Sequence, residues 1–306
     1  MERNEAATAG NQGAARSAAL KFIVLVGVVS LFADMTYEGA RSINGPFLAV
    51  LGASGVVVGI VAGSGELIGY ALRLVSGYIS DRTRQYWAIT IIGYCINLLA
   101  VPILALAGNW EIAAVFMITE RVGKAIRTPA RDAMLSHATK QVGVGFGFGL
   151  HEALDQIGAV TGPLIVSLVL YLNGGYKTGF AILLVPAIMA LLVLAAARLI
   201  YPSPREFEET AFTKVESKGL PRVFWVYLAG ISLIAAGYAD FPLVAFHFEK
   251  ASVVSDNWIP VFYAVAMGVD GVAALAFGRL FDRIGISALA IAALASAFFA
   301  PLVFLG

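Results

Sequence analysis

Nine runs of mostly apolar residues, each long enough to cross a lipid bilayer as a helix, follow one another along this chain. A membrane-spanning helix needs about 20 such residues. In a chain of 306 residues, 59% are hydrophobic and only 13% are charged, and a soluble fold of this length cannot bury so much apolar surface. The sequence therefore predicts an all-α membrane protein and excludes a cytosolic enzyme, a secreted disulfide scaffold and a disordered chain. The runs cover residues 20–48, 54–77, 88–107, 110–133, 142–171, 177–198, 222–248, 257–277 and 287–306.

The remaining composition excludes several other classes of function. A net charge of +1 provides no basic field for nucleic acid. The single cysteine, Cys95, cannot form an internal disulfide, and no Cys/His spacing indicates a zinc site. No nucleophile motif and no phosphate-binding loop is present. We therefore expect no enzyme activity, no metal and no cofactor, and the predicted partners are the lipid bilayer and a small molecule.

Polar segments divide the chain into regions. Residues 1–19 are polar and are expected to form a cytosolic tail, because the apolar run that follows them lacks the cleavage pattern of a signal peptide. Residues 200–221 are charged and bracketed by prolines, which is typical of a linker. The predicted domains are thus a six-helix bundle over 20–199, a cytosolic linker over 200–221 and a partial bundle of three spans over 222–306.

The distribution of Lys and Arg predicts the orientation. With the N-terminus in the cytoplasm, fifteen of the 21 basic residues fall in cytoplasmic segments, four fall within spans, and only Lys177 and Lys250 fall on the opposite face. Cytoplasmic segments of membrane proteins carry such an excess of Lys and Arg. The sequence therefore predicts a multi-pass protein of the cell membrane, here a bacterial inner membrane, with a cytoplasmic N-terminus.

An internal repeat relates two parts of the chain. A Gly-x-x-x-Asp-Arg motif follows the second span and recurs 201 residues later, after the eighth span. At nearly the same offset, Glu38 in the first span corresponds to Asp240 in the seventh. Duplicated halves are typical of secondary transporters. The two copies of the motif consist of Gly77, Asp81 and Arg82, and of Gly278, Asp282 and Arg283.

These motifs resemble those of the major facilitator superfamily, whose signature loop follows span 2 and is repeated after span 8. Arg84 stands where the family usually has Gly. A second stretch, with Gly158, Gly162 and Pro163, resembles a motif common among antiporters of the superfamily. A third, over 120–133, resembles the basic motif of span 4, with Arg121 as its embedded arginine. The resemblance covers residues 20–306.

The resemblance implies the fold of that superfamily, with two bundles of six helices and the two loop motifs acting in gating. Because the chain ends within its ninth span, it is expected to be a partial chain that lacks three spans.

Charged residues inside the predicted spans indicate a polar interior. Asp34, Glu38 and Arg41 in the first span are spaced i, i+4, i+7 and share one helix face. Exposed to lipid, the three would cost about 8–10 kcal/mol together. We therefore expect them to face the bundle interior, with Arg41 pairing with Glu38.

Further ionisable residues are expected to line the same central cavity, where transporters bind their substrates. Arg121 has an alternative role as a structural partner of Asp34 or Asp155, and Glu66 as a hydrogen-bond partner of a neighbouring helix. Glu152 and His151 lie near the cytoplasmic half of span 5, where they can reach water. The predicted substrate- and proton-binding residues are Asp34, Glu38, Arg41, Glu66, Arg121, Glu152, Asp155 and Asp240.

The sequence favours a secondary active transporter that works by alternating access as a monomer. Burial favours the protonated form of a carboxyl group, so Asp34, Glu38 or Asp155 is predicted to exchange protons. The antiporter-like motif favours export of a small solute in exchange for protons. Uptake by symport remains open, as does export of a divalent metal bound near His151 and Asp155. A membrane sensor or scaffold on the same fold is the alternative from another class.

Overall fold

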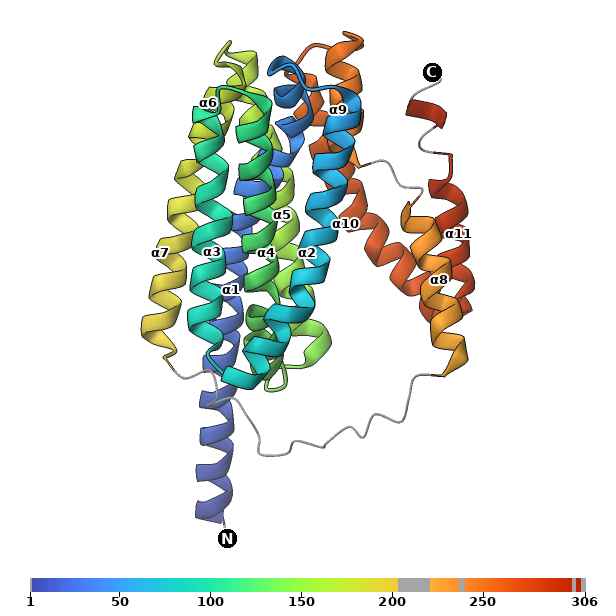
Figure 1. Ribbon diagram of the computed structural model, residues 1–306. Helices are drawn as coiled ribbons and strands as arrows, with labels where there is room; N and C mark the ends of the chain where they lie inside the picture. The colour runs from blue at the N-terminus through green and yellow to red at the C-terminus, as the bar shows by residue number, and fades with distance from the viewer. Residues whose placement is uncertain (1, 203–220, 237–239, 299–300, 304–306) are drawn as a thin grey trace. The chain divides into compact units, whose positions relative to one another are not determined.

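The computed structural model describes residues 2–202, 221–236, 240–298 and 301–303, and the described residues form helices joined by turns, with no strand among them. Figure 1 shows the helices from α1 to α7 lying side by side. The elements are α1 (Glu2–Val50), α2 (Gly55–Thr83), α3 (Tyr86–Ile103), the 3₁₀ helix η1 (Leu104–Leu106), α4 (Trp110–Thr139), α5 (Val144–Tyr171), α6 (Gly175–Ile182), α7 (Leu184–Ile200), α8 (Arg222–Ala236), α9 (Phe241–Lys250), α10 (Trp258–Ile284) and α11 (Ser287–Ser296).

Capping residues begin two of the long helices at the turns that the sequence indicates. Ser54 precedes α2, and its hydroxyl accepts a hydrogen bond from the backbone nitrogen of Val57 at 3.3 Å. Asn109 precedes α4, and its Oδ1 accepts one from the backbone nitrogen of Ile112 at 2.9 Å. Such side chains satisfy donors that the first helical turn leaves unpaired.

Among the residues that the structure describes, five helices or helix pairs are long and apolar enough to cross a membrane, judged by length and composition. They cover Arg16–Val50, Gly55–Thr83, Tyr86–Leu106, Phe146–Tyr171 and Gly175–Ile200, the last of which joins α6 and α7. The 30-residue helix α4 is long enough but carries many charged residues. The protein is therefore an all-α membrane protein.

The chain divides into two compact units that differ from the predicted regions. One consists of Met1–Glu208 with Phe241–Gly268, and the other of Glu209–Asp240 with Val269–Gly306. In the first unit, α9 packs against α1 and α2, so part of the sequence predicted for the second bundle belongs with the first. The run predicted as one span over 222–248 is divided between α8 and α9.

The two polar segments of the sequence, residues 1–19 and 200–221, differ in how far the structure describes them. Helix α1 begins at Glu2, so the segment predicted as a tail continues into the first span as helix. Most of the predicted linker, residues 203–220, lies outside the described residues.

Two apolar clusters meet on α1 at the point where its charged stretch begins. One cluster includes Phe22, Val29 and Ala33 of α1. The other includes Tyr37 and Ile43 of the same helix and continues toward the turn over 51–54 between α1 and α2. We call this end of the first unit the turn end. Asp34, Glu38 and Arg41, which we call the charged stripe of α1, therefore begin at the junction of the two clusters.

Close packing joins α1 to α5. A Cβ atom at Gly158 would collide with the carbonyl oxygen of Leu31, and one at Gly162 would collide with that of Met35. Small residues spaced four apart allow two helix backbones to approach in this way. Pro163 follows inside α5. The antiporter-like motif thus holds α5 directly against the charged stretch of α1.

Candidate functional site

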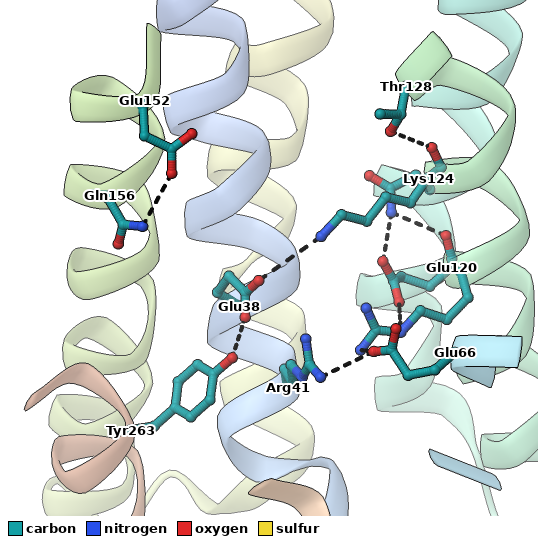
Figure 2. A network of polar contacts seen from close by, with 11 residues as sticks. Glu38, Arg41, Glu66, Glu120, Lys124, Thr128, Glu152, Gln156 and Tyr263 are labelled. Atoms are coloured by element: carbon teal, nitrogen blue, oxygen red, sulfur yellow. Dashed lines mark hydrogen bonds and ion pairs between the residues drawn. The ribbon is translucent and has the colours of Figure 1, made fainter. Parts of the chain in front are cut away.

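The charged stripe of α1 faces the protein interior. Asp34 and Glu38 are buried, with 6% and 7% of their surface exposed. Arg41 reaches α2, where its Nη2 lies 3.0 Å from Oε1 of Glu66 (Figure 2). The i, i+4, i+7 spacing therefore brings three charged side chains from one helix face into the bundle.

Glu66 is shared by two arginines from different helices. Besides Arg41, it contacts Arg121 of α4, with Nη2 of Arg121 3.3 Å from Oε1 of Glu66. Arg121 also contacts Glu120, from Nε to Oε2 at 3.3 Å. Asn97 of α3 donates hydrogen bonds to the Oε1 atom and the backbone oxygen of Glu120, at 2.7 and 3.1 Å. Helices α1, α2, α3 and α4 are thus joined by one polar network.

Lys124 extends this network to the centre of α1. Its Nζ lies 3.9 Å from Oε1 of Glu38 (Figure 2). The same atom lies 3.8 Å from the ring centroid of Tyr37. A lysine over a tyrosine ring gains a cation–π attraction that is larger when the pair is desolvated. Lys124 therefore anchors α4 to α1 by an ion pair and a ring contact together.

A second polar cluster joins α1, α4 and α5 around Ser30. The Ser30 hydroxyl accepts a hydrogen bond from Nη1 of Arg131 at 3.0 Å and lies 3.0 Å from Nε2 of His151. The other ring nitrogen of His151, Nδ1, is 3.5 Å from Oδ2 of Asp155, one turn further along α5. The tautomer of His151 that donates to Asp155 leaves Nε2 free to accept from Ser30.

Asp34 and Asp155 face each other from α1 and α5. A Cβ atom at Gly158, one turn beyond Asp155, would lie 3.1 Å from Cβ of Asp34. Their two charges act on each other, and Arg127 acts on both. Oδ1 of each aspartate is buried and has no hydrogen-bond partner. Buried polar atoms are normally paired, so these two oxygens mark a place where a proton or a ligand can bind.

Arg127 is the largest of the fully buried side chains and stacks between two rings. Only 1% of its surface is exposed, and its guanidinium carbon lies 4.2 Å from the ring centroid of Tyr94 and 5.7 Å from that of Tyr37. Its Nε and Nη1 atoms have no hydrogen-bond partner. A planar guanidinium stacks well on aromatic faces, so this side chain is positioned by its rings and leaves donors available.

The structure separates the predicted site residues into groups. Glu38, Arg41, Glu66 and Arg121 belong to the network at the turn-end side of the stripe. Arg121 contacts Glu66 and Glu120. Glu152 is exposed and accepts a hydrogen bond from Gln156 at 3.3 Å. Asp240 is partly buried and directly precedes α9.

The two loop motifs lie at helix ends. Gly77 of α2 faces Pro129 of α4, while Asp81 and Arg82 are exposed near the end of α2. Nη1 of Arg82 donates to the hydroxyl of Tyr78 at 2.7 Å. Arg283 is exposed in the last turn of α10. The side chain of Asp282 and the surroundings of Gly278 lie outside the described residues.

Among the described residues, no set of metal ligands accompanies these groups. Within the part of the chain that the structure describes, no three His, Cys, Asp or Glu side chains lie close enough to hold a metal ion. His151 and Asp155 are neighbours, but no such set of three among the described residues includes them.

Sequence reasoning identified the basic motif of α4 with Arg121 but missed the burial of its later arginines. Arg127 and Arg131 are counted among the fifteen cytoplasmic basic residues of the predicted orientation, but Arg127 is fully buried and Arg131 bonds to buried Ser30. The signal available in the sequence was a spacing of four, three and four residues, which places side chains on one helix face. The residues with this spacing are Glu120, Lys124, Arg127 and Arg131. Tyr263 of α10, whose hydroxyl donates to Oε2 of Glu38, was also missed. No spacing rule relates residues 225 positions apart.

Known proteins resemble this chain along most of its length. The profile of the family described as Major Facilitator Superfamily matches residues 25–306. An uncharacterized protein of Mycobacterium tuberculosis is 43% identical over 287 residues, which cover 91% of this chain and 70% of the relative. An uncharacterized MFS-type transporter of Methanocaldococcus jannaschii is 26% identical over 271 residues, covering 87% of this chain and 67% of the relative.

A solved structure has the same fold. The crystal structure of the nucleoside transporter NupG aligns with a TM-score of 0.67 over 87% of this chain and 69% of that chain. Only 12% of the residues are identical, so this likeness concerns the arrangement of the helices.

Proposed function

Since this chain belongs to the Major Facilitator Superfamily, we propose that it exports a small solute across the cell membrane in exchange for protons. Membership of the superfamily makes it a transporter of some solute. The antiporter-like motif, which lies directly against the charged stretch of α1, supports exchange as the mode of coupling. The N-terminus is cytoplasmic in this proposal because Lys and Arg concentrate on that side, and the turn end then faces away from the cytoplasm.

The facing pair of Asp34 and Asp155 carries the proposal. Both carboxylates lie in the bundle interior, they repel each other, and each has one buried oxygen without a hydrogen-bond partner. A proton bound to either one removes this repulsion and supplies a donor for an unpaired oxygen. Binding of a proton or of a cationic solute group thereby changes the charge of a site that lies between helices of the first bundle.

The basic face of α4 completes the binding site in this proposal. Arg127 supplies two buried donors without partners, close enough to act electrostatically on both aspartates. The site thus presents acceptors from α1 and α5 and donors from α4. Such a combination suits a small polar solute that carries both hydrogen-bond donors and acceptors, with transport by alternating access about this position.

Purified full-length protein in proteoliposomes provides the test. An imposed pH gradient is followed by a pH-sensitive dye while small organic compounds and divalent metals are added in turn. We expect solute-dependent proton movement that is lost in Asp34→Asn and Asp155→Asn. The matched control is Glu111→Gln, because Glu111 is an exposed acid in the first turn of α4.

The other outcomes separate the competing functions. Solute movement without a proton signal would refute proton coupling and leave uniport or another coupling ion. Proton and solute movement in the same direction would replace export with uptake by symport. If a folded protein moves none of the compounds, the sensor or scaffold becomes the better explanation.

A further inference from the structure

Glu38 links helices from distant parts of the chain through its two carboxylate oxygens. Oε1 faces Lys124 of α4 at 3.9 Å, and Oε2 accepts a hydrogen bond from the hydroxyl of Tyr263 in α10 (Figure 2). Glu38 and Tyr263 are both buried. A hydrogen bond to a carboxylate is about twice as strong as one between neutral groups. The strength of the contact with α10 therefore depends on the charge of Glu38.

The segment from α9 to the start of α10 closes the turn end of the first unit. The backbone of α1 at Gly45 touches the backbone of Pro242, so closely that a Cβ atom there would collide with the Pro242 carbonyl oxygen. The ring of Phe246 covers Gly55 at the start of α2. Segment 241–268 thus packs tightly on two helices of the bundle.

Two further hydrogen bonds hold this segment near its exposed edge. The Ser167 hydroxyl donates to the backbone oxygen of Asn257 at 2.7 Å, and the Tyr176 hydroxyl donates to Oε2 of Glu249 at 2.6 Å. The Tyr263–Glu38 bond differs from these two because its acceptor belongs to the charged network in the bundle interior.

We propose that Tyr263 is the positioning residue through which the charge of Glu38 controls closure of the turn end. When a proton or a cationic group of a solute neutralises Glu38, its bond to Tyr263 weakens and segment 241–268 separates from α1. This inference rests on the proposed function, since it explains how an occupied site opens one end of the protein. The charged groups that act on Glu38 are Asp34 and Arg41 of α1 and Arg121 and Lys124 of α4.

A single reporter cysteine measures whether the turn end is closed. Val244 of α9 is 3% exposed, and a cysteine of smaller volume fits its place. In a Cys95→Ala background, Val244→Cys should react slowly with a charged maleimide in detergent micelles. Opening of the turn end exposes this position, so the labelling rate follows the population of the open state and requires no knowledge of the solute.

Removal of the Tyr263 hydroxyl should speed labelling. Tyr263→Phe keeps the ring contact with Phe241, whose centroid lies 4.5 Å away, and loses only the hydrogen bond. We expect labelling of Val244→Cys to become at least about tenfold faster, the factor that corresponds to one lost hydrogen bond to a charged group. The matched control is Tyr94→Phe, which removes another buried tyrosine hydroxyl but leaves α10 untouched.

Neutralisation of Glu38 tests the role of charge separately from packing. Glu38→Gln has nearly the same shape, and we expect it also to speed labelling. Because both changes act on one bond, the double variant with Tyr263→Phe should label no faster than the faster single variant. A purely structural role for Tyr263 would not make the effect of Glu38→Gln disappear in this way.

Two results would overturn the inference. One is labelling of Tyr263→Phe, or of Glu38→Gln, at the rate of the parent. The other is a double variant in which the two effects multiply. Size-exclusion profiles show whether each variant is folded, and each single variant tests the bond independently of the other. A protein that labels as expected but transports nothing would refute the proposed function and leave this contact established.

Discussion

Arg84 and Gly285 have the same left-handed backbone conformation, 201 positions apart, directly after α2 and α10 respectively. Their φ angles are 56° and 62°. Glycine adopts this conformation freely, whereas a residue with a Cβ atom is strained there by roughly 1–2 kcal/mol. The two copies of the loop motif thus end their helices alike, although only the second has the residue that suits the turn.

We expect Arg84→Gly to stabilise the protein by about 0.5–1 kcal/mol, because the relieved strain exceeds the added entropy of the unfolded chain. Gly285→Ala should destabilise it by about 1 kcal/mol. Thermal unfolding in detergent measures both changes. Arg84→Lys is the control, since it keeps the strain and should unfold at the parent temperature. A decrease in unfolding temperature for Arg84→Gly would contradict this explanation.

Substitution in the α1–α5 contact should be much less tolerated than elsewhere on α5. Gly158→Ala and Gly162→Ala place a methyl group against carbonyl oxygens of α1, and we expect each to lower the free energy of unfolding by about 1–3 kcal/mol. Gly149→Ala on the same helix meets no atom within 4 Å and should be neutral or slightly stabilising. Equal thermal stability of all three variants would show that α1 and α5 are not in close contact.

Glu66→Gln should leave two arginines without their shared partner. Glu66 is one-third exposed, so solvent screens its ion pairs. We therefore expect the free energy of unfolding to decrease by only about 1–2 kcal/mol. The double variant Glu66→Gln with Arg41→Gln removes one of the uncompensated charges and should recover part of the stability. Thermal unfolding of the single and double variants measures this, and strictly additive losses would argue against a shared ion pair.

Arg127→Lys should be damaging even though the charge is kept. The ammonium group of lysine is not planar and cannot stack on the rings of Tyr94 and Tyr37 as a guanidinium does. We expect the free energy of unfolding to decrease by about 1–2 kcal/mol. Arg82→Lys is the matched control because Arg82 is exposed at the end of α2. Thermal unfolding compares the two. If both variants unfold at the parent temperature, the ring contacts contribute nothing to stability.

The family and the helical architecture could be predicted from the sequence. Membrane helices satisfy their own backbone hydrogen bonds, so runs of apolar residues and the turns between them locate the helices without knowledge of their neighbours. Helices α2 and α5 begin and end within a few residues of the predicted runs, except that α2 extends to Thr83. The cost of exposing charge to lipid likewise predicts that Asp34 and Glu38 face inward, and both are buried.

Only the tertiary structure determines which residues contact those buried charges. Spacing along α1 places Glu38 and Arg41 on one face, but the rotation and depth of α2, α4 and α10 determine that Arg41 reaches Glu66 and that Glu38 reaches Tyr263. Arg127 lies fully buried between two tyrosines from α1 and α3. A one-dimensional pattern specifies which face of a helix is polar, whereas contact distances depend on how several helices pack together.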